Sequence, residues 1–475
     1  MLIRWLPILI LALFRFWDLG ARPVHHDEAV NGWFVDGIFS RGYYSYDPQN
    51  YHGPFFFYVL TLFVKFFGRS VEVMRATTVL AGVAVTLSPW LFRKWIGNTT
   101  AWIAALIFAV SPAMVFYSRY AIHEMFYMLS IILFFYNWIR VREEGFSFRS
   151  ILGFGLTLGL LAGIKENFVL YGGSIILAEG ILWAIDRRPP LRLDRKFWTG
   201  LGGGFAIGSV FIFLCFNAFF LDEEGMRKFF HAFELWSETG TKGNGHQKPW
   251  DYWFGLMAGY EWAFLLGLIT LPYYAFRGKG PVRLLAWSTA IHFLGYSVVA
   301  YKTPWCMLSF AWGFVFLASI ALSTLFTSKG PAFAGWGLLS ILTVKAAVQS
   351  WEVSWRNPDQ DGHPYIYGQT YRDFIDQTDV VLREVSERPG LKDTLRVQVI
   401  SAYTWPLPYV LGEIKMTAYH GRDNAPAVLD GDWVMIDQNF EQEFAPRLRG
   451  SYSRFEARSR QWAYPMVFFK KKQGP

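Results

Sequence analysis

Residues 305–327 read WCMLSFAWGFVFLASIALSTLFT, a run of 23 residues without a charged side chain. About 20 consecutive apolar residues suffice for a helix to cross the hydrocarbon core of a bilayer. Runs of this kind recur along the chain, at about 2–19, 71–92, 99–117, 121–139, 150–164, 167–185, 197–220, 252–276, 282–300, 305–327 and 331–349. These eleven runs predict a polytopic α-helical membrane protein with about eleven transmembrane helices within residues 1–350.

The composition of the 475-residue chain agrees with this class of fold. Hydrophobic residues make up 53% and aromatic residues 19%, against 17% charged, which disfavours both a disordered chain and a soluble protein with one core. Of the 45 Lys and Arg and the 37 Asp and Glu, 16 and 17 follow Trp351, so the positive excess belongs to the apolar part. A nucleic-acid-binding protein would place that charge on a polar domain, so no nucleic acid is expected as a partner. Cys215 and Cys306 lie inside apolar runs and predict neither a disulfide nor a metal site.

The orientation of the spans depends on the short apolar stretch Pro54–Phe67. If this stretch lies on the outer interface instead of crossing, every predicted inward loop is basic, as the positive-inside rule requires. Those loops carry Arg93, Lys94, Arg140, Arg142, Arg149, Arg187, Arg188, Arg192, Arg195, Lys196, Arg277, Lys279, Arg283 and Lys329. If the stretch crosses, the same loops lie outside. We therefore predict a cytoplasmic amino terminus, an interfacial first outer loop at residues 20–70 and an extracytoplasmic carboxy-terminal part.

From Trp351 onward the pattern changes to that of a soluble domain. A helical period is followed by short strand-like runs. These segments are Tyr371–Val385, Val397–Ile400, Val434–Ile436 and Pro465–Phe469. Residues 351–475 are therefore predicted to form an extracytoplasmic α/β domain that follows a transmembrane domain at 1–350.

Four ionisable side chains stand together in the first outer loop, at His25, His26, Asp27 and Glu28. The apolar residues that follow predict a helix on the membrane surface, with the acidic pair at its amino-terminal end. One interpretation is a charged helix start with solvated histidines, because a helix amino terminus stabilises carboxylates. The other is a general base at the bilayer edge, where partial loss of water can tune its pKa.

Three further outward turns carry ionisable residues. They contain Arg119 and Glu124, Lys165 and Glu166, and Tyr301, Lys302 and Trp305. Local ion pairs would explain the first two turns, and a lysine that extends toward the headgroups would explain the third. The alternative is a functional site, because ionisable groups facing into a helical bundle are functional candidates by default. A phosphate-bearing lipid needs cations for its phosphate, a carboxylate base for an acceptor hydroxyl and an apolar flank for its tail.

These motifs resemble those of the GT-C membrane glycosyltransferases. The residues that carry the resemblance are His26-Asp27-Glu28 after the first span, Tyr51-His52-Gly53-Pro54 before an aromatic-rich stretch, Ser118-Arg119 shortly before Glu124, Lys165-Glu166, and Tyr301-Lys302-Thr303-Pro304-Trp305. Residues 1–350 are similar to the protein mannosyltransferase and ArnT-like group, which uses polyprenyl-phosphate-linked sugars as donors. Within that group the motifs resemble most a prokaryotic branch associated with protein glycosylation and lipid flipping.

The resemblance implies a role for each matching residue. Asp27, with Glu28 beside it, would deprotonate the acceptor hydroxyl, and Glu124 falls where the group has a second-loop aspartate. ArnT-like loops also carry a basic residue soon after the acid pair and a lysine before the following proline, whereas this sequence has Val30 and His52-Gly53. The residues left to bind the donor phosphate are Lys302, Arg119, Lys165 and His52, with His26, Glu166, Tyr301 and Trp305 in support.

The implied substrates are a polyprenyl-phosphate sugar donor and an acceptor hydroxyl on a protein, a lipid or a glycan. The implied location is the outer face of a prokaryotic cytoplasmic (inner) membrane, among membrane lipids. Because the leaving lipid phosphate carries a charge that is already stable, the reaction needs cations and positioning, and no cofactor is expected. A divalent metal ion held by His25, His26, Asp27 and Glu124 is an alternative that we do not favour.

Two rival functions belong to other classes. A lipid or lipid-linked-sugar transporter, or a flippase component, would place polar groups near the middle of the membrane, whereas here they lie at the outer ends of the spans. A scaffold for other glycosylation proteins would leave the acid pair without a purpose.

Overall fold

The computed structural model describes residues 5–50, 52–186, 193–242, 245–327 and 332–472. Tyr51 and the basic residues Arg187, Arg188, Arg192 and Lys329 lie outside the described residues. The chain divides into two compact units. Unit 1 consists of Met1–Leu19 and Gly37–Ser354, and unit 2 consists of Gly20–Asp36 and Trp355–Pro475.

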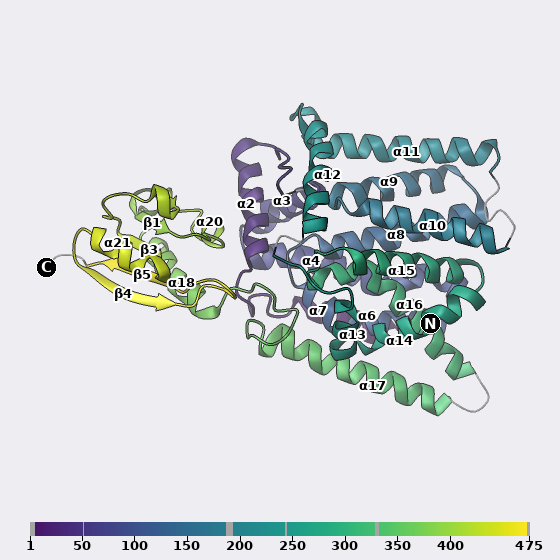
Figure 1. Ribbon diagram of the computed structural model, residues 1–475. Coiled ribbons are helices and arrows are strands. Elements are labelled where there is room, and N and C mark those ends of the chain that lie inside the picture. Colours follow the sequence, from purple (N-terminus) through teal and green to yellow (C-terminus); the bar gives the residue numbers. More distant parts are fainter. Residues whose placement is uncertain (1–4, 51, 187–192, 243–244, 328–331, 473–475) are drawn as a thin grey trace. The chain divides into compact units, whose positions relative to one another are not determined.

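Unit 1 is helical. Its helices are α1 (Leu6–Leu13), α3 (Phe55–Phe67), α4 (Val71–Leu87), α5 (Arg93–Ile96), α6 (Asn98–Val110), α7 (Pro112–Ser118), α8 (Glu124–Glu144), α9 (Phe148–Ile164), α10 (Phe168–Asp186), α11 (Arg195–Phe216), α12 (Gly225–Lys242), α13 (Tyr252–Tyr260), α14 (Trp262–Arg277), α15 (Gly280–Val298), α16 (Leu308–Thr327) and α17 (Ala332–Trp351). Helices α8, α9, α10 and α11 run alongside one another, and α9 packs most extensively against α11 (Figure 1). Helices cover all eleven predicted apolar runs as far as these are described.

Length and composition identify five or six candidate membrane spans among the described helices. Five described stretches are long and apolar enough to cross a membrane, and α6 with α7 makes a sixth if this bent pair is one span. The five are Val71–Ile96, Glu124–Glu144, Phe168–Asp186, Arg195–Phe216 and Pro304–Phe326. The other apolar runs form shorter or interrupted helices, such as α9 with 17 residues, or α13 and α14, which are separated at Glu261. Helix α3 has 13 residues, about 20 Å, and is not among the candidate spans.

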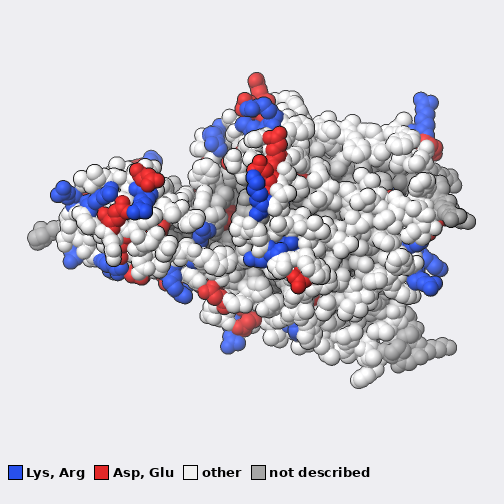
Figure 2. All heavy atoms as spheres, in the orientation of Figure 1, with Lys and Arg blue, Asp and Glu red and all other residues white. Residues whose placement is uncertain are grey.

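The surface of unit 1 carries an uncharged belt. In Figure 2 the area over α9, α10 and α11 is almost entirely white, with charged side chains gathered toward the helix ends. Large apolar side chains point outward there, among them Ile176, which is 73% exposed, and Val210, which is 59% exposed. An apolar belt bounded by charged ends is the surface that a helical membrane protein presents to lipid.

A bend of 60° separates α6 from α7, and contacts from the start of α14 and from α17 hold it. A proline begins α7 and prevents the helix from continuing through the bend. The backbone N–H of Ala113 and the hydroxyl of Ser111 donate to the buried Glu261 carboxylate at 2.6 and 2.9 Å. The hydroxyl of Ser350, in α17, donates to the carbonyl oxygen of Val110 at 2.7 Å. The polar groups that the bend exposes are therefore paired inside the bundle, as a membrane interior requires.

Unit 2 contains a five-stranded mixed sheet. Its strands are β1 (Arg396–Ile400), β2 (Met416–His420), β3 (Trp433–Asp437), β4 (Tyr452–Ala457) and β5 (Met466–Lys471), and its main helix is α18 (Arg372–Glu387). The order is β2-β1-β3-β5-β4, with β1 parallel to β2 and β3, and β5 antiparallel to β3 and β4. In register, Val399 lies opposite Met435, which lies opposite Phe468.

The core of unit 2 lies between α18 and one face of the sheet. Phe374, Val381 and Val385 recur at helical spacing along α18 and pack with strand residues such as Val399 and Met435. The predicted small α/β domain is therefore present. The sequence pattern predicted α18, β1, β3 and β5 but missed β2 and β4, the two edge strands, which are mostly half-buried or exposed and carry weak alternation.

Residues 20–36 belong to unit 2, although the sequence assigned the loop 20–70 to the membrane domain. Nε2 of His25 donates to the carbonyl oxygen of Tyr367 at 2.8 Å. The side-chain amide of Gln369 donates to the carbonyl oxygen of Pro23 at 3.0 Å. Because these partners lie more than 340 residues apart in the chain, no local sequence pattern reveals them.

Candidate active site

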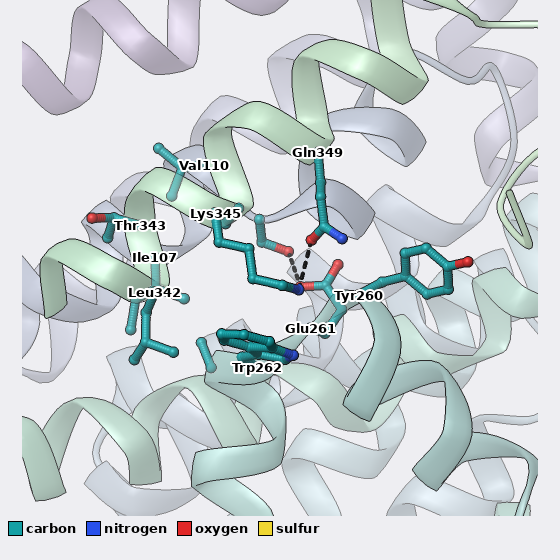
Figure 3. A pocket seen from close by; sticks show the side chains of 12 residues that line it. Ile107, Val110, Tyr260, Glu261, Trp262, Leu342, Thr343, Lys345 and Gln349 are labelled. Atoms are coloured by element: carbon teal, nitrogen blue, oxygen red, sulfur yellow. Dashed lines mark hydrogen bonds between the residues drawn. The ribbon is translucent and has the colours of Figure 1, made fainter. Parts of the chain in front are cut away.

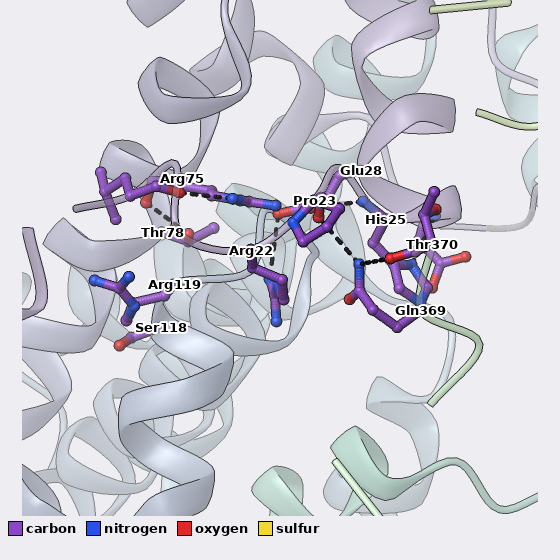
Figure 4. A network of polar contacts seen from close by, with 12 residues as sticks. Arg22, Pro23, His25, Glu28, Arg75, Thr78, Ser118, Arg119, Gln369 and Thr370 are labelled. Carbon is purple, nitrogen blue, oxygen red and sulfur yellow. Dashed lines mark hydrogen bonds and ion pairs between the residues drawn. The ribbon is translucent and has the colours of Figure 1, made fainter. Parts of the chain in front are cut away.

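The acid pair stands in the first turn of α2 (His26–Arg41), and one of its members closes that turn. The backbone N–H of His25 donates to Oε2 of Glu28 at 3.0 Å, and the backbone N–H of Asp27 donates to Nδ1 of His25 at 3.0 Å. Arg22 lies 3.5 Å from the other oxygen of Glu28 (Figure 4). Glu28 is fully buried. This reciprocal pattern is a helix cap, so Glu28 is held as a structural carboxylate.

The proton on His25 can be placed from its partners. Its Nδ1 accepts a backbone N–H, so the proton lies on Nε2, which donates to the carbonyl oxygen of Tyr367. Burial lowers the pKa of His25, against the opposing effect of the neighbouring Asp27 charge. His25 is therefore a neutral capping residue and links the start of α2 to the segment around Tyr367.

Asp27 differs from Glu28 in exposure. Its side chain is 37% exposed, whereas that of Glu28 is fully buried. The amino terminus of a helix favours the ionised form of a carboxylate. The geometry thus presents the Asp27 carboxylate on a rigid, capped helix start, which is the arrangement that a general base needs.

Arg460 lies beside the acid pair and was missed in the sequence. It comes from the segment between β4 and β5, and its Nη1 donates to Nδ1 of His26 at 2.9 Å. Burial lowers the pKa of His26 to about 4, the nearby Asp27 charge opposes this shift and the Arg460 charge adds to it. His26 is therefore neutral at physiological pH. No signal in the sequence connects Arg460 to a histidine 434 residues away.

A buried aspartate fixes the loop that faces Arg460. Asp437, at the end of β3, accepts hydrogen bonds from the hydroxyl of Ser401 and the backbone N–H of Ala402, each at 2.8 Å. Burial raises the pKa of Asp437, and these two hydrogen bonds oppose the shift. The loop they hold carries Tyr403, whose ring lies 5.2 Å from the Arg460 guanidinium, and Trp405.

Unit 1 holds a second polar cluster, and here the structure brings four predicted residues together. Nζ of Lys165 lies 2.5 Å from Oε1 of Glu124, and both side chains are about 5% exposed. His52 lies 3.1 Å from Glu166. The histidine can reach the Lys165-Glu166 turn because Gly53 packs against the end of α9, where a Cβ would lie 2.3 Å from a backbone carbonyl oxygen. Packing against α9 thus requires a residue without a side chain at the second position of the His52-Gly53-Pro54 motif.

Arg119 is bound to the backbone that leads toward the acid loop. Its Nη1 donates to the carbonyl oxygens of Arg15 and Trp17 at 2.8 and 2.6 Å, and its Nη2 donates to that of Asp18 at 2.7 Å. Nη1 of Arg75 donates to the carbonyl oxygen of Leu19 at 2.6 Å. Arg75 and Arg119 are both labelled in Figure 4. These two buried guanidinium groups hold residues 15–19 in place.

The fourth predicted turn is also tied to backbone oxygens. Nζ of Lys302 donates to the carbonyl oxygens of Val299 and Lys248. Tyr301 forms an isolated antiparallel bridge with Gln247. Trp305 packs edge-on against two tyrosine rings of the α7 region. The roles predicted for Lys302, Tyr301 and Trp305 in substrate binding stay predictions.

A pocket in unit 1 lies apart from the predicted residues. It is lined by α6, the start of α14 and α17, and Figure 3 shows Lys345 extending across it. Nζ of Lys345 donates to Gln349 and to the carbonyl oxygen of Gly259, each at 3.0 Å, and lies 4.1 Å above the Trp262 ring. Within the described ranges, no group of three or more His, Cys, Asp or Glu side chains is placed to hold a metal ion.

Comparison with known proteins identifies the fold. A family model described as dolichyl-phosphate-mannose-protein mannosyltransferase matches residues 51–213. The structure is similar to that of ArnT from Cupriavidus metallidurans bound to undecaprenyl phosphate, with a TM-score of 0.70, 13% identity and 99% of each chain covered. The chain has a GT-C fold.

A second GT-C structure is similar over most of the chain. It is the archaeal oligosaccharyltransferase AglB from Archaeoglobus fulgidus in complex with an inhibitory peptide and a dolichol-phosphate, with a TM-score of 0.59, 13% identity, and 98% of this chain and 74% of that chain covered. A comparison with curated proteins gives no significant match. The predicted resemblance to the GT-C glycosyltransferases of the ArnT-like kind is confirmed. Within the described residues, five or six stretches are long and apolar enough to cross a membrane, as expected for that fold.

Proposed function

We propose that this protein moves a sugar from a polyprenyl-phosphate-linked donor to an acceptor hydroxyl on the outer face of a prokaryotic cytoplasmic membrane. The observation that carries the proposal is that the two carboxylates in the first turn of α2 differ in exposure. Glu28 is buried in the helix cap, and the side chain of Asp27 is 37% exposed. The GT-C fold and the lipid phosphates bound to the similar structures support this reaction class.

In the proposed reaction Asp27 removes the proton of the acceptor hydroxyl as its oxygen attacks the anomeric carbon of the donor. The new carbon–oxygen bond forms while the bond between that carbon and the phosphate oxygen breaks. The polyprenyl phosphate leaves with the electron pair, and the proton stays on Asp27. The enzyme supplies a base, positioning and cations, and we propose that no metal ion is required.

The proposed orientation places unit 2 outside the cytoplasm. It is supported by the basic residues in the predicted inward loops, such as Arg140, Arg142 and Arg149. Single cysteines test it in a chain whose two natural cysteines, both buried, are replaced by serine. A cysteine at the exposed Ser386 should react with an impermeant reagent in intact cells, and one at the exposed Phe148 should react only after the membrane is opened. The reverse pattern would refute the orientation.

The transfer reaction is tested with the purified full chain in lipid vesicles and a radiolabelled polyprenyl-phosphate sugar. Asp27→Asn keeps the shape of the side chain and removes the base, so transfer should fall by about 10²- to 10⁴-fold. Asp36→Asn, on the same helix, is the matched control and should leave the rate unchanged. Near-normal transfer by Asp27→Asn at equal protein levels would remove Asp27 from this role. Movement of the labelled lipid across the bilayer without sugar transfer would favour the rival function, a lipid-linked-sugar transporter.

A further inference from the structure

The cations predicted to bind the donor phosphate already have partners within the protein. Arg119 donates to three backbone carbonyl oxygens, Lys302 donates to two, and Lys165 forms a buried ion pair with Glu124. A phosphate would have to compete with these contacts. The reaction still requires positive charge near the base, because the leaving group is an anion.

Arg460 is a cation with hydrogen-bonding capacity left over. A guanidinium has five N–H donors. Nη1 donates to His26, and the buried Nε has no hydrogen-bond partner among the described residues of the chain. His26 is neutral and accepts this bond, so it does not balance the charge of the arginine. Arg460 as a whole is only half-buried, so the guanidinium donors beyond Nη1 and Nε remain to donate to the oxygens of a phosphate.

Arg460 is half-buried, so its surroundings lower the local dielectric while part of the side chain stays exposed to solvent. Burial lowers the pKa of Arg460, while the charges of Asp27 and Asp437 and the nearby Tyr403 oppose this. The Tyr403 ring is 61% exposed and lies against the guanidinium. A charge-assisted hydrogen bond is stronger in such a half-buried setting than in water.

Aromatic side chains lie next to the His26 ring, which Arg460 contacts. Trp405 lies 6.0 Å from the His26 ring and 6.2 Å from the Trp33 ring, and Trp33 is 45% exposed. An anion bound at Arg460 would therefore have an apolar aromatic flank on one side and the Asp27 carboxylate near it. An amphiphilic phosphate, with a charged head and an apolar chain or sugar face, fits this combination.

We propose that Arg460 binds a substrate phosphate beside Asp27, and that the carboxy-terminal unit thereby supplies part of the active site. The inference rests on the proposed transfer reaction and deepens it. The ligand class is a phosphate ester with an apolar substituent. Its source is either the polyprenyl phosphate of the donor or a phosphate carried by a lipid acceptor, and the kinetic measurements below distinguish the two.

The first experiment measures binding to the full chain in lipid nanodiscs, with geranyl phosphate as the probe and geraniol as its uncharged counterpart. Arg460→Gln should weaken geranyl phosphate binding by about ten- to a hundredfold and leave geraniol binding unchanged, as expected for loss of a charge-assisted contact. Arg460→Lys should recover part of the affinity. Arg458→Gln is the matched control, because this neighbouring arginine is exposed and pairs with Asp373. It should bind like the wild type.

The outcomes separate binding from a structural role. Unchanged geranyl phosphate affinity in a folded Arg460→Gln variant would overturn the proposal, as would an equal loss in Arg458→Gln. If Arg460→Gln fails to fold, Arg460→Lys decides the matter: weaker binding of geranyl phosphate alone supports the proposal, and equal weakening of both probes refutes it. His26→Asn, which keeps the arginine, should retain phosphate binding.

Kinetics of sugar transfer identify the source of the phosphate. A raised donor KM in Arg460→Gln, with acceptor KM unchanged, assigns the site to the donor, and the opposite pattern assigns it to a phosphate on the acceptor. Binding of geranyl phosphate does not depend on turnover. Arg460-dependent binding without any sugar transfer by the wild type would therefore support the phosphate site while the proposed function fails. Transfer at full rate with unaltered binding in Arg460→Gln would leave the function standing and remove the site.

Discussion

Replacing Arg119 with methionine distinguishes a structural arginine from a phosphate ligand. The guanidinium is 5% exposed, and it donates to the carbonyl oxygens of Arg15, Trp17 and Asp18 at 2.6 to 2.8 Å. Methionine fills a similar volume but leaves these carbonyls without their donor. A buried polar group that loses its partner costs about 1–3 kcal/mol. Only the Arg15 contact is fully buried, so the variant should lose about 1–3 kcal/mol of stability from it and less from the two part-buried contacts.

The same change should affect catalysis through position rather than through substrate binding. Because Arg119 holds the backbone of residues 15–19, its loss should lower kcat and leave the donor KM within about twofold of the wild-type value. Arg119→Lys should recover part of the stability, since an ammonium has three donors but no planar fork. Arg93→Met, at an exposed arginine, is the control.

Two measurements on detergent-solubilised full-length protein check this prediction. The first is thermal unfolding, monitored by size-exclusion chromatography, and the second is the initial rate of transfer at varied donor concentration. A variant with wild-type stability and a strongly raised donor KM would refute the reasoning. It would show that Arg119 binds the donor phosphate, as the sequence alone predicted.

Three further predictions follow from packing and charge. Alanine at Gly53 would place a Cβ 2.3 Å from a backbone carbonyl oxygen of α9 and should lower the unfolding temperature, whereas Gly172→Ala, with open space around it, should not. Lys165→Met leaves Glu124 buried without its partner and should lower the free energy of unfolding by about 3–5 kcal/mol. The double variant Lys165→Met with Glu124→Leu should recover most of this loss. Equal stability of the single and double variants would contradict the ion pair. Because the pKa of His26 falls from 6.5 to about 4 on folding, the unfolded chain binds more protons between these values, so stability should drop by about 3 kcal/mol from pH 6.5 to pH 4. His26→Asn should flatten the pH dependence of the unfolding temperature, and an unchanged slope would count against a buried neutral histidine.

The sequence was most informative where structure follows from a local period. The apolar runs predicted most helices of unit 1 but not α12, which lies between two of the runs, and the spacing of Phe374, Val381 and Val385 predicted α18. It could not settle how many helices cross the membrane, because breaks such as that between α6 and α7 depend on partners from α14 and α17. Edge strands carry little alternation, so β2 and β4 were missed.

The candidate site was predicted in part for a similar reason. Each interpretation of the acid pair fits one of its members. The charged helix start fits Glu28, which forms the cap, and the general base fits Asp27, which is exposed. The sequence could not divide these roles, since the difference lies in which carboxylate faces inward. Arg460 and Asp437 gave no signal, because their partners come from distant parts of the chain. The sequence had offered ion pairs within each turn, Arg119 with Glu124 and Lys165 with Glu166. The structure instead pairs Lys165 with Glu124 across two turns, and it ties Arg119 to backbone carbonyl oxygens.

The membership of residues 20–36 in unit 2 has a consequence for biogenesis. The ribosome makes the acid helix before its partners Tyr367, Gln369 and Arg460, which emerge more than 340 residues later. A chain that stalls before Trp355 would leave a helical bundle in the membrane whose acid helix lacks all three partners. In such a fragment the contacts that hold the start of α2 would be missing, and Asp27 would not be presented as the proposed base. Under the proposed function, a chain interrupted before these partners are made would therefore not consume lipid-linked sugars.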